Sequence, residues 1–546
     1  MQNTIRCDVL IVGGGAAATR AAIEAKDNGA DVLIATKRKY GYSGSSFYVN
    51  SIPWGIMRAG GGIEAQKKFL EEILSASCGC LNSKLTEILV RDSDDRFQDL
   101  VDYGLKFRNN DDIPCFGREP RGALLISMDN ARQCFKDQIR KRNIKVAENL
   151  HICDLIVKDN ICCGAIGIDE EGNWVKICSK TVILASGGAE YLWEYGFANA
   201  DMTGDAYAMA ARNGARLTNL EFIQFIPGII SPLQKTNFHH PTLESIPLIY
   251  NKHGEEFLEK YLPENVTVED CLKARAKHGP FSYEDESKYF DIAICMEAAK
   301  TGDNKAVGAE IRYRDELCGK FAVWNDFLKS RGVDPQKDAL TIYPHCQGFN
   351  GGVAIDEQCS TDIENLYACG ECAGGPHGAN RIGGNAVLGT QVFGKIAGEQ
   401  AARKAMTAKA IEITDTDALF KIGESFDTGY TTRITPEEIM KNIKSTMQES
   451  AFIIRDETNL RKGIEKIEAM QKEFNPCQFI KDGDYARKAL NAYNSLSTAR
   501  LILYSMLNRK ESRGSHYRKD FPNRNNKEYG KMVFIRLNKD NDIFIE

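Results

Sequence analysis

The N-terminal segment predicts a strand, a tight turn, a helix and a second strand. Apolar runs at residues 7–12 and 31–36 enclose the segment GGGAAATRAAIEAKDNGA. Gly13, Gly15 and Ala18 fill the spacing G-x-G-x-x-A, in which the first glycine permits the turn and the second lets a pyrophosphate approach. The helix N-terminus adds partial positive charge. We therefore expect a βαβ unit that binds a dinucleotide.

Two further strands that end in glycines lie far along the chain. The segment KTVILASGG covers residues 180–188, and NLYACGECAGG covers residues 365–375. The second places Glu371 at the carboxyl end of its strand, where a carboxylate can accept hydrogen bonds from ribityl hydroxyls. Ordinary strand-to-turn glycines are the alternative. Distant segments that converge on one long cofactor favour FAD over NAD.

A third glycine-rich stretch, GGPHGANRIGGNAVLG at residues 374–389, holds one permanent cation, Arg381. Glycines let backbone N–H groups approach a ligand closely, and a guanidinium offers a two-pronged fork for a carboxylate or phosphate. We expect an anionic or flavin-like group at this stretch.

Length and composition limit the class of protein. A chain of 546 residues exceeds one ordinary domain, and 70 basic against 75 acidic side chains argue against a general nucleic-acid binder. No apolar run approaches the roughly 20 residues that span a bilayer, which predicts a cytoplasmic protein without membrane insertion. The 17 scattered cysteines are expected to be reduced, and none of their spacings resembles an iron–sulfur or other metal site.

The distribution of residue types along the sequence suggests three structural units. Residues 1–227 and 343–410 form an α/β cofactor-binding domain in two parts, interrupted by a charged and aromatic-rich capping domain at 228–342. From about 411 the pattern turns helical, and Thr435-Pro436-Glu437-Glu438 supplies an N-cap, a proline at N1 and a glutamate at N3. The tail KMVFIRLNKDNDIFIE predicts a closing hairpin, so residues 411–546 are expected to be a helical bundle with a terminal hairpin.

Eight ordered motifs resemble the flavoprotein subunits of succinate dehydrogenase, fumarate reductase and L-aspartate oxidase. They are VGGGAAATRAA, TVILASGGA, TGDAYAMAARNGA, LEFIQFIPG, NKHGEEFLEKY, LYACGE, HGANRIGGNAVL and ESRGSHYRKDFP. The resemblance covers nearly the whole chain. It implies FAD in a Rossmann-like domain, an α+β capping domain, a C-terminal helical domain, and hydride exchange between flavin N5 and a substrate.

The resemblance also implies which residues contact the cofactor. In the respiratory complexes a histidine after the second strand tethers the flavin covalently, whereas Ser45 stands at that position here, so FAD is expected to be non-covalent. Lys37 follows the second strand, where these proteins often have a Ser-Lys or Glu-Lys pair. The expected FAD contacts are Gly13, Gly15, Ala16, Ala17, Lys37, Ser43, Ser45, Ser46, Asp205, Glu371, Arg381, Ala386 and Val387.

The substrate site departs from the family pattern. Where members that act on C4 dicarboxylates have histidines, this chain has Ile226 in Gln224-Phe225-Ile226-Pro227-Gly228 and Gln347 before the later Gly-Gly. The family's proton-shuttle arginine is not recognisable, and Lys288 stands in the nearest comparable stretch. Among the residues that bind the substrate carboxylates in this family, Arg381 is the one that is clearly present in this chain. A C4 dicarboxylate substrate is therefore not expected.

The candidate catalytic residues are Arg381, His345, Lys288 and His377. Arg381 would anchor and polarise the substrate, while His345, Lys288 or a tyrosine of the cap would exchange a proton. For His377 a contact with flavin or substrate and a purely structural role both stay open. The resulting hypothesis is an enoate reductase or dehydrogenase acting on a small carboxylate or carbonyl compound. The alternatives are an L-aspartate oxidase-like enzyme, or a flavoprotein that relays electrons to an iron–sulfur or ferredoxin-like partner.

Overall fold

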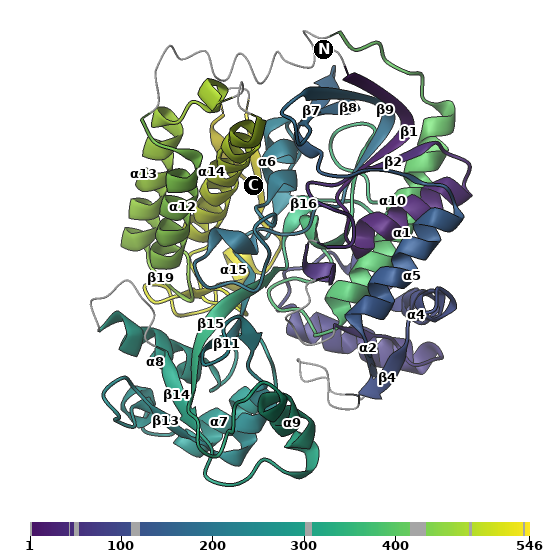
Figure 1. Ribbon diagram of the computed structural model, residues 1–546. Coiled ribbons are helices and arrows are strands. Elements are labelled where there is room, and N and C mark those ends of the chain that lie inside the picture. Colours follow the sequence, from purple (N-terminus) through teal and green to yellow (C-terminus); the bar gives the residue numbers. More distant parts are fainter. Residues whose placement is uncertain are drawn as a thin grey trace.

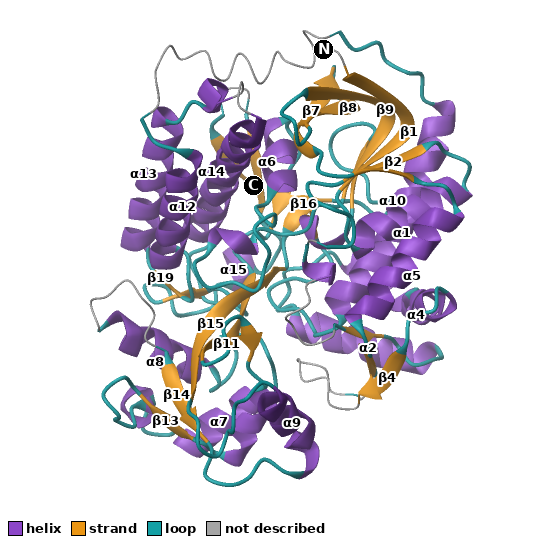
Figure 2. Ribbon diagram, viewed as in Figure 1, coloured by secondary structure: helices purple, strands orange, loops and turns teal. Residues whose placement is uncertain are grey.

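The computed structural model describes residues 3–42, 44–47, 54–110, 119, 121–300, 308–414, 433–479, 483–538 and 541–546. Figure 1 shows a sheet-and-helix layer at the upper right, a helical bundle at the upper left and a capping segment below. Figure 2 shows that strands dominate the centre of the first layer and of the cap, whereas the bundle is almost entirely helical. This is the mixed α/β architecture with a helical C-terminal part that the sequence predicts.

The main sheet has seven strands in the described residues, in the order β6-β2-β1-β9-β8-β7, with β17 also paired to β9. β1 pairs in parallel with β2 and β9, which confirms the βαβ unit at the N-terminus. The strands are β1 (Asn3–Val12), β2 (Val32–Ala35), β6 (Lys145–Ala147), β7 (His151–Lys158), β8 (Ile161–Ile168), β9 (Trp174–Leu184) and β17 (Leu366–Ala368).

Helices α1 (Ala16–Asp27) and α10 (Asn385–Thr407) pack against each other beside this sheet. A Cβ atom at Gly398 would lie 2.3 Å from the carbonyl oxygen of Ala21, and one at Gly394 would lie 3.0 Å from that of Ala17. Small residues on both helices therefore allow this close approach. The other helices on this side are α2 (Ile63–Ala76), α3 (Ser83–Arg91), α4 (Ser93–Asp102) and α5 (Met128–Lys141). Helix α6 (Asp205–Arg212) lies between the sheet and the helical bundle (Figure 1).

The capping segment is built on a five-stranded sheet in the order β12-β11-β15-β14-β13. β11 (Ile223–Ser231) pairs antiparallel with β15 (Leu340–Phe349), so each expected domain boundary, at 227/228 and at 342/343, falls inside one of two paired strands. The remaining elements are β12 (Thr236–Asn237), β13 (Leu248–Tyr250), β14 (Ala309–Arg312), α7 (Val268–Ala276), α8 (Lys288–Ala299) and α9 (Ala322–Ser330).

The C-terminal bundle contains α12 (Pro436–Ser450), α13 (Glu457–Glu473) and α14 (Gly483–Asn508). The predicted N-cap is present, since the Thr435 hydroxyl accepts a hydrogen bond from the Glu438 amide at 3.2 Å while the Glu438 carboxylate accepts one from the Thr435 amide at 2.8 Å. The chain then continues through α15 (Asn526–Tyr529) to the predicted terminal hairpin, β21 (Phe534–Leu537) and β22 (Ile543–Ile545).

Small sheets join these parts. The hairpin extends a sheet with β10 (Leu217–Thr218), β16 (Gly352–Ala354) and β18 (Ala373–Gly374). Two further sheets contain β3 (Gly55–Met57), β4 (Phe107–Asn110) and β5 (Gly122–Leu125), and β19 (Ile454–Arg455) with β20 (Tyr517–Arg518).

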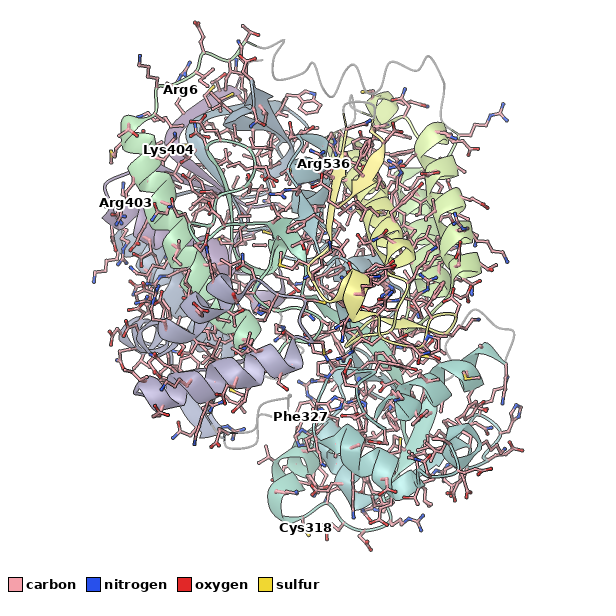
Figure 3. The ribbon with its side chains drawn as sticks, turned by 180° about the vertical axis from the view of Figure 1, so that it is seen from behind. Arg6, Cys318, Phe327, Arg403, Lys404 and Arg536 are labelled. Carbon is pink, nitrogen blue, oxygen red and sulfur yellow. The ribbon has the colours of Figure 1, made fainter. Side chains whose placement is uncertain are left out.

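The view from behind locates the outer faces of these parts. It shows Arg403 and Lys404 near the end of α10, Arg536 on the terminal hairpin, and Cys318 and Phe327 on the cap (Figure 3). The cysteines that the structure describes carry free thiols, and Cys318 is the exposed one among them. No described helix is long and apolar enough to cross a bilayer.

Candidate active site

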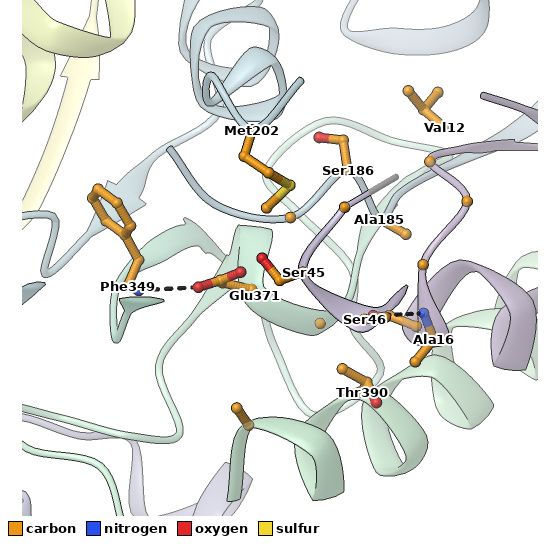
Figure 4. Close-up of a pocket in the computed structure, with 18 of the residues that line it drawn as sticks. Val12, Ala16, Ser45, Ser46, Ala185, Ser186, Met202, Phe349, Glu371 and Thr390 are labelled. Atoms are coloured by element: carbon orange, nitrogen blue, oxygen red, sulfur yellow. Dashed lines mark hydrogen bonds between the residues drawn. The ribbon is translucent and has the colours of Figure 1, made fainter. Parts of the chain in front are cut away.

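A cavity of about 250 Å³ opens where β1, β2, β9 and β17 end. The carboxyl edge of parallel strands is where open α/β sheets bind their ligands. Figure 4 shows the turn after β1 on one side of this cavity and Glu371 and Phe349 on the other. Residues that are far apart in the sequence therefore meet here, as one long cofactor requires.

Most of the predicted site residues line this cavity. They are Gly13, Gly15, Ala16, Ala17, Lys37, Ser45, Ser46, Asp205, Glu371, His377, Arg381, Ala386 and Val387. Ser43 lies outside the described residues.

The phosphate end of the cavity is formed by the turn between β1 and α1. Gly13 has φ +129°, and a Cβ atom there would lie 2.2 Å from the carbonyl oxygen of Ala185. Gly15 leaves space toward the cavity, and the Ala16 amide donates to the Ser46 hydroxyl at 3.1 Å. The first turn of α1 carries no acidic side chain, so its dipole is available to an anion. These features fit a pyrophosphate.

A second helix also begins at the cavity. α10 follows Gly384, which has φ +84°, and its first turn also carries no acidic residue. Ala386, Val387 and Thr390 from this helix line the wall. A ring system that becomes negatively charged on reduction would lie against favourable helix dipoles here.

A buried ion network closes the end near β2. The Lys37 ammonium lies 2.8 Å from Oδ2 of Asp205 and 3.1 Å from the Thr203 hydroxyl. Burial favours the neutral form of Asp205, but the charge of Lys37, and then the nearby His151 ring with its Nε2 3.6 Å from Oδ1, outweigh it and hold the pKa of that carboxyl well below its usual range. The network fixes the start of α6 against the end of β2.

Glu371 stands midway along the cavity, in the short 3₁₀ turn η6 (Gly370–Cys372). Its Oε1 accepts a hydrogen bond from the Phe349 amide at 3.1 Å (Figure 4). This bond holds the carboxyl at the cavity wall. There it can accept from hydroxyl groups of a sugar-like chain.

Arg381 and His377 occupy the far end. The Arg381 side chain is buried, donates to the Ile382 carbonyl at 3.2 Å, and lies 3.5 Å from Oε1 of Gln347. Burial and then the charge of Arg381 lower the pKa of His377 to about 3, so its ring is neutral at physiological pH. Nδ1 of His377 is buried without a hydrogen-bond partner among the described residues. A ligand in the cavity can therefore complete its bonding.

The two remaining catalytic candidates do not line this cavity. The Lys288 ammonium lies over the rings of Tyr283 and Tyr289, at 4.7 and 5.1 Å from their centroids. His345 stacks on Phe197 with a centroid distance of 4.7 Å, and its Nδ1 bonds the Tyr343 carbonyl at 2.8 Å. Burial lowers the pKa of His345 to about 4. The roles suggested for both stay predictions.

Several lining residues were not singled out from the sequence. Gly187 lies in a motif that carried the family resemblance, and Met202 directly precedes another, so that resemblance could have located both. His151 and Phe349 come from strands without a recognisable motif, and only the fold brings them to the cavity. Among the described residues no cluster of three or more His, Cys, Asp or Glu side chains could hold a metal ion.

Comparison with known proteins agrees with this geometry. The family described as FAD binding domain matches residues 8–387, and the family described as fumarate reductase flavoprotein C-term matches residues 440–546. An uncharacterized FAD-dependent oxidoreductase of Methanocaldococcus jannaschii is 30% identical over 95% of this chain and 94% of its own length. A fumarate reductase (CoM/CoB) subunit of Methanothermobacter marburgensis is 29% identical, over 94% of each chain.

Among solved structures, a quinol fumarate reductase chain of E. coli superposes with a TM-score of 0.82, at 21% identity, over 100% of this chain and 97% of its own. At that identity the likeness concerns the fold. The two matched families together span most of the chain, and the cavity has the phosphate turn and carboxylate that a flavin nucleotide requires. This chain therefore belongs to the fumarate reductase and L-aspartate oxidase family of flavoproteins, and is an FAD-dependent oxidoreductase.

Proposed function

We propose that this chain exchanges a hydride with a small substrate that bears a carboxylate or carbonyl group, and that this substrate is not a C4 dicarboxylate. FAD, when bound, supplies hydride acceptance and donation at N5 of its isoalloxazine. The observation that carries the proposal is Arg381, a buried permanent cation at the cavity wall, close to where a substrate would meet the flavin. Such a guanidinium can bind one carboxylate bidentately.

Gln347 supports the second half of the proposal. It lines the cavity beside Arg381, where the resemblance predicts a histidine in members that act on C4 dicarboxylates. An amide can donate a hydrogen bond, but it brings no positive charge for a second carboxylate. A substrate with one carboxylate and an apolar remainder does not need that second positive charge.

The low pKa of His377 limits the roles that this residue can have in catalysis. With a pKa of about 3 its ring is neutral at pH 7, holds no proton to give up as an imidazolium, and is a weak base. We therefore propose His377 as a hydrogen-bonding group. Reduction would need a proton donor from elsewhere. We propose Lys288 or a tyrosine of the cap, because burial lowers the pKa of His345 to about 4 and leaves its ring neutral as well.

A panel of 2-enoates, 2-hydroxy acids and amino acids tests the proposal. The holoenzyme would be mixed with each compound without oxygen, and flavin absorbance would report reduction of oxidised enzyme or reoxidation of dithionite-reduced enzyme. We expect a response from a monocarboxylic compound that Arg381→Met abolishes. A rapid response from fumarate or succinate alone would contradict it.

Two other functions have support from named relatives. An L-aspartate oxidase of Clostridium acetobutylicum is 28% identical over 72% of this chain, which favours amino-acid oxidation as the second candidate. In the panel, flavin reduction by L-aspartate followed by reoxidation in air would select it. The methanogen relative is named as one subunit of a fumarate reductase, which supports assembly with an electron-transfer partner. Co-purification of an iron–sulfur protein from the native source would test that assembly.

A further inference from the structure

A second buried carboxyl group, Glu190, lies close to Glu371. Glu190 belongs to the 3₁₀ turn η2 (Glu190–Leu192), is 1% exposed and does not line the cavity. A Cβ atom added at Gly188 would lie 2.7 Å from Oε1 of Glu190 and 3.0 Å from Cδ of Glu371. The two carboxyl groups thus converge on one glycine.

No cation balances Glu190 within the described part of the chain. Neither of its carboxyl oxygens has a hydrogen-bond partner there, and it forms no ion pair. Two carboxylates cannot hydrogen-bond each other, because neither oxygen can donate. Two carboxyl groups that converge in a buried place therefore favour a proton on one of the two.

The groups that face this pair do not replace that proton. From β15 the buried Cys346 thiol, and from α6 the buried Tyr207 phenol, both have a pKa raised well above its usual value, by burial first and then by these two carboxyls. From α12 the Lys444 ammonium lies over the ring of Tyr191, 3.3 Å from its centroid. All three elements therefore leave the pair without a compensating charge.

We propose that Glu190 is a neutral carboxylic acid that donates a hydrogen bond to the Glu371 carboxylate, so that the two groups share one proton. Glu190 is then a positioning residue, because it fixes Glu371, whose other bond comes from the Phe349 amide, toward the cofactor. Burial, followed by the charge of Glu371, raises the pKa of Glu190 well above its usual value, in agreement with this assignment.

The inference rests on Glu371 being an FAD contact, but its first test needs no cofactor. The infrared spectrum of the apoprotein in D₂O at pH 8 should contain a protonated carboxyl C=O band that disappears in Glu190→Gln. The matched control is Glu244→Gln, since Glu244 lies in an exposed ion pair with Lys320, and the band should persist there. An identical band in wild type and Glu190→Gln would overturn the proposal.

The second test measures FAD affinity against pH by quenching of flavin fluorescence. If binding requires the shared proton, the wild-type Kd rises by up to about tenfold per pH unit above the pKa of Glu190. Glu190→Gln keeps a donor that cannot titrate, so its Kd should match wild type at pH 7 and stay flatter at high pH. Glu190→Leu removes the donor and should weaken binding at every pH. Parallel pH profiles for wild type and Glu190→Gln would also overturn the proposal.

Discussion

A methyl group at Gly13 would lie 2.2 Å from the carbonyl oxygen of Ala185, at the point where β1 and β9 end beside the cofactor cavity. Gly13 also has φ +129°, a backbone conformation that side chains rarely adopt. Its lack of a side chain thus serves the packing of the sheet as well as the approach of a phosphate. Gly15, two residues on, has an ordinary extended conformation with φ −81°.

This difference predicts that substitutions at the two glycines affect different properties, namely the stability of the apoprotein and the binding of FAD. Gly13→Ala should destabilise the apoprotein by about 1–3 kcal/mol, because strain and a backbone clash are present without any ligand. Gly15→Val should destabilise the apoprotein less than Gly13→Ala, since the only close neighbour is the Ser46 side chain, 3.1 Å from the added Cβ atom, yet it should abolish FAD loading. Thermal unfolding of both apoproteins and their flavin content would be compared. Full flavin loading of Gly15→Val would show that the pyrophosphate lies elsewhere.

The pair Lys37–Asp205 predicts a pH-dependent stability. Lys37→Met leaves a buried carboxylate without its ammonium. It should lower the free energy of unfolding by an amount near the lower end of the about 3–5 kcal/mol that is typical of a broken buried ion pair. Because the pKa of Asp205 is lowered on folding, the pair stabilises the protein above the unfolded value of 3.8, and this stability is lost as the pH falls through the lower folded value.

Urea unfolding at pH 7 and pH 3.5 would measure that contribution. The gap between wild type and Lys37→Met should be wide at pH 7 and narrower at pH 3.5. Lys145→Met is the matched control, because its pair with Asp31 is largely exposed and should be worth at most about 1 kcal/mol. Equal losses in the two variants would contradict the buried network.

These residues also show what the sequence could predict. The capping box at Thr435 and Glu438 and the βαβ turn at Gly13 are local, so spacing alone located them. Lys37 and Asp205 are separated by 168 positions, and nothing local reveals their contact. The same holds for Glu190 and Glu371, which meet because two strand ends of one sheet converge. The placement of Lys288 and His345 depends on how the cap packs, which no local pattern specifies.

Ser45 predicts how FAD is held. It lines the cavity at the position where a histidine forms a covalent bond to the flavin in the respiratory complexes. A serine hydroxyl does not form that bond. Precipitation of the holoprotein with acid should therefore release all the FAD into the supernatant. Yellow colour that stays with the washed precipitate would contradict a non-covalent cofactor.

The effect of the Arg381 charge on the pKa of His377 can be measured by titration. Burial is the larger cause of the low pKa of His377 and the Arg381 charge the second, so Arg381→Met should raise this pKa without restoring the ordinary value of 6.5. Nitrogen NMR of the histidine-labelled protein would follow the ring. In wild type it should stay neutral from pH 5 to 8. A protonated His377 at pH 6 would show that the ring is not buried beside the guanidinium.

The last prediction is that fumarate and succinate bind weakly, and that one substitution partly restores them. A second buried carboxylate without a cation or strong donors loses several kcal/mol, and each 1.4 kcal/mol is about tenfold, so the Kd should be at least about a hundredfold above that of a good monocarboxylate ligand. Gln347→His places an imidazole at the cavity wall beside Arg381 and should lower the Kd for fumarate more than that for a monocarboxylate. Arg381→Lys should weaken both ligands, because an ammonium cannot form the two parallel bonds of the guanidinium. Titration of the oxidised holoenzyme, followed by flavin absorbance, measures all of these constants. Micromolar binding of fumarate by the wild type, or equal effects of Gln347→His on both ligands, would show that Gln347 does not select against the second carboxylate.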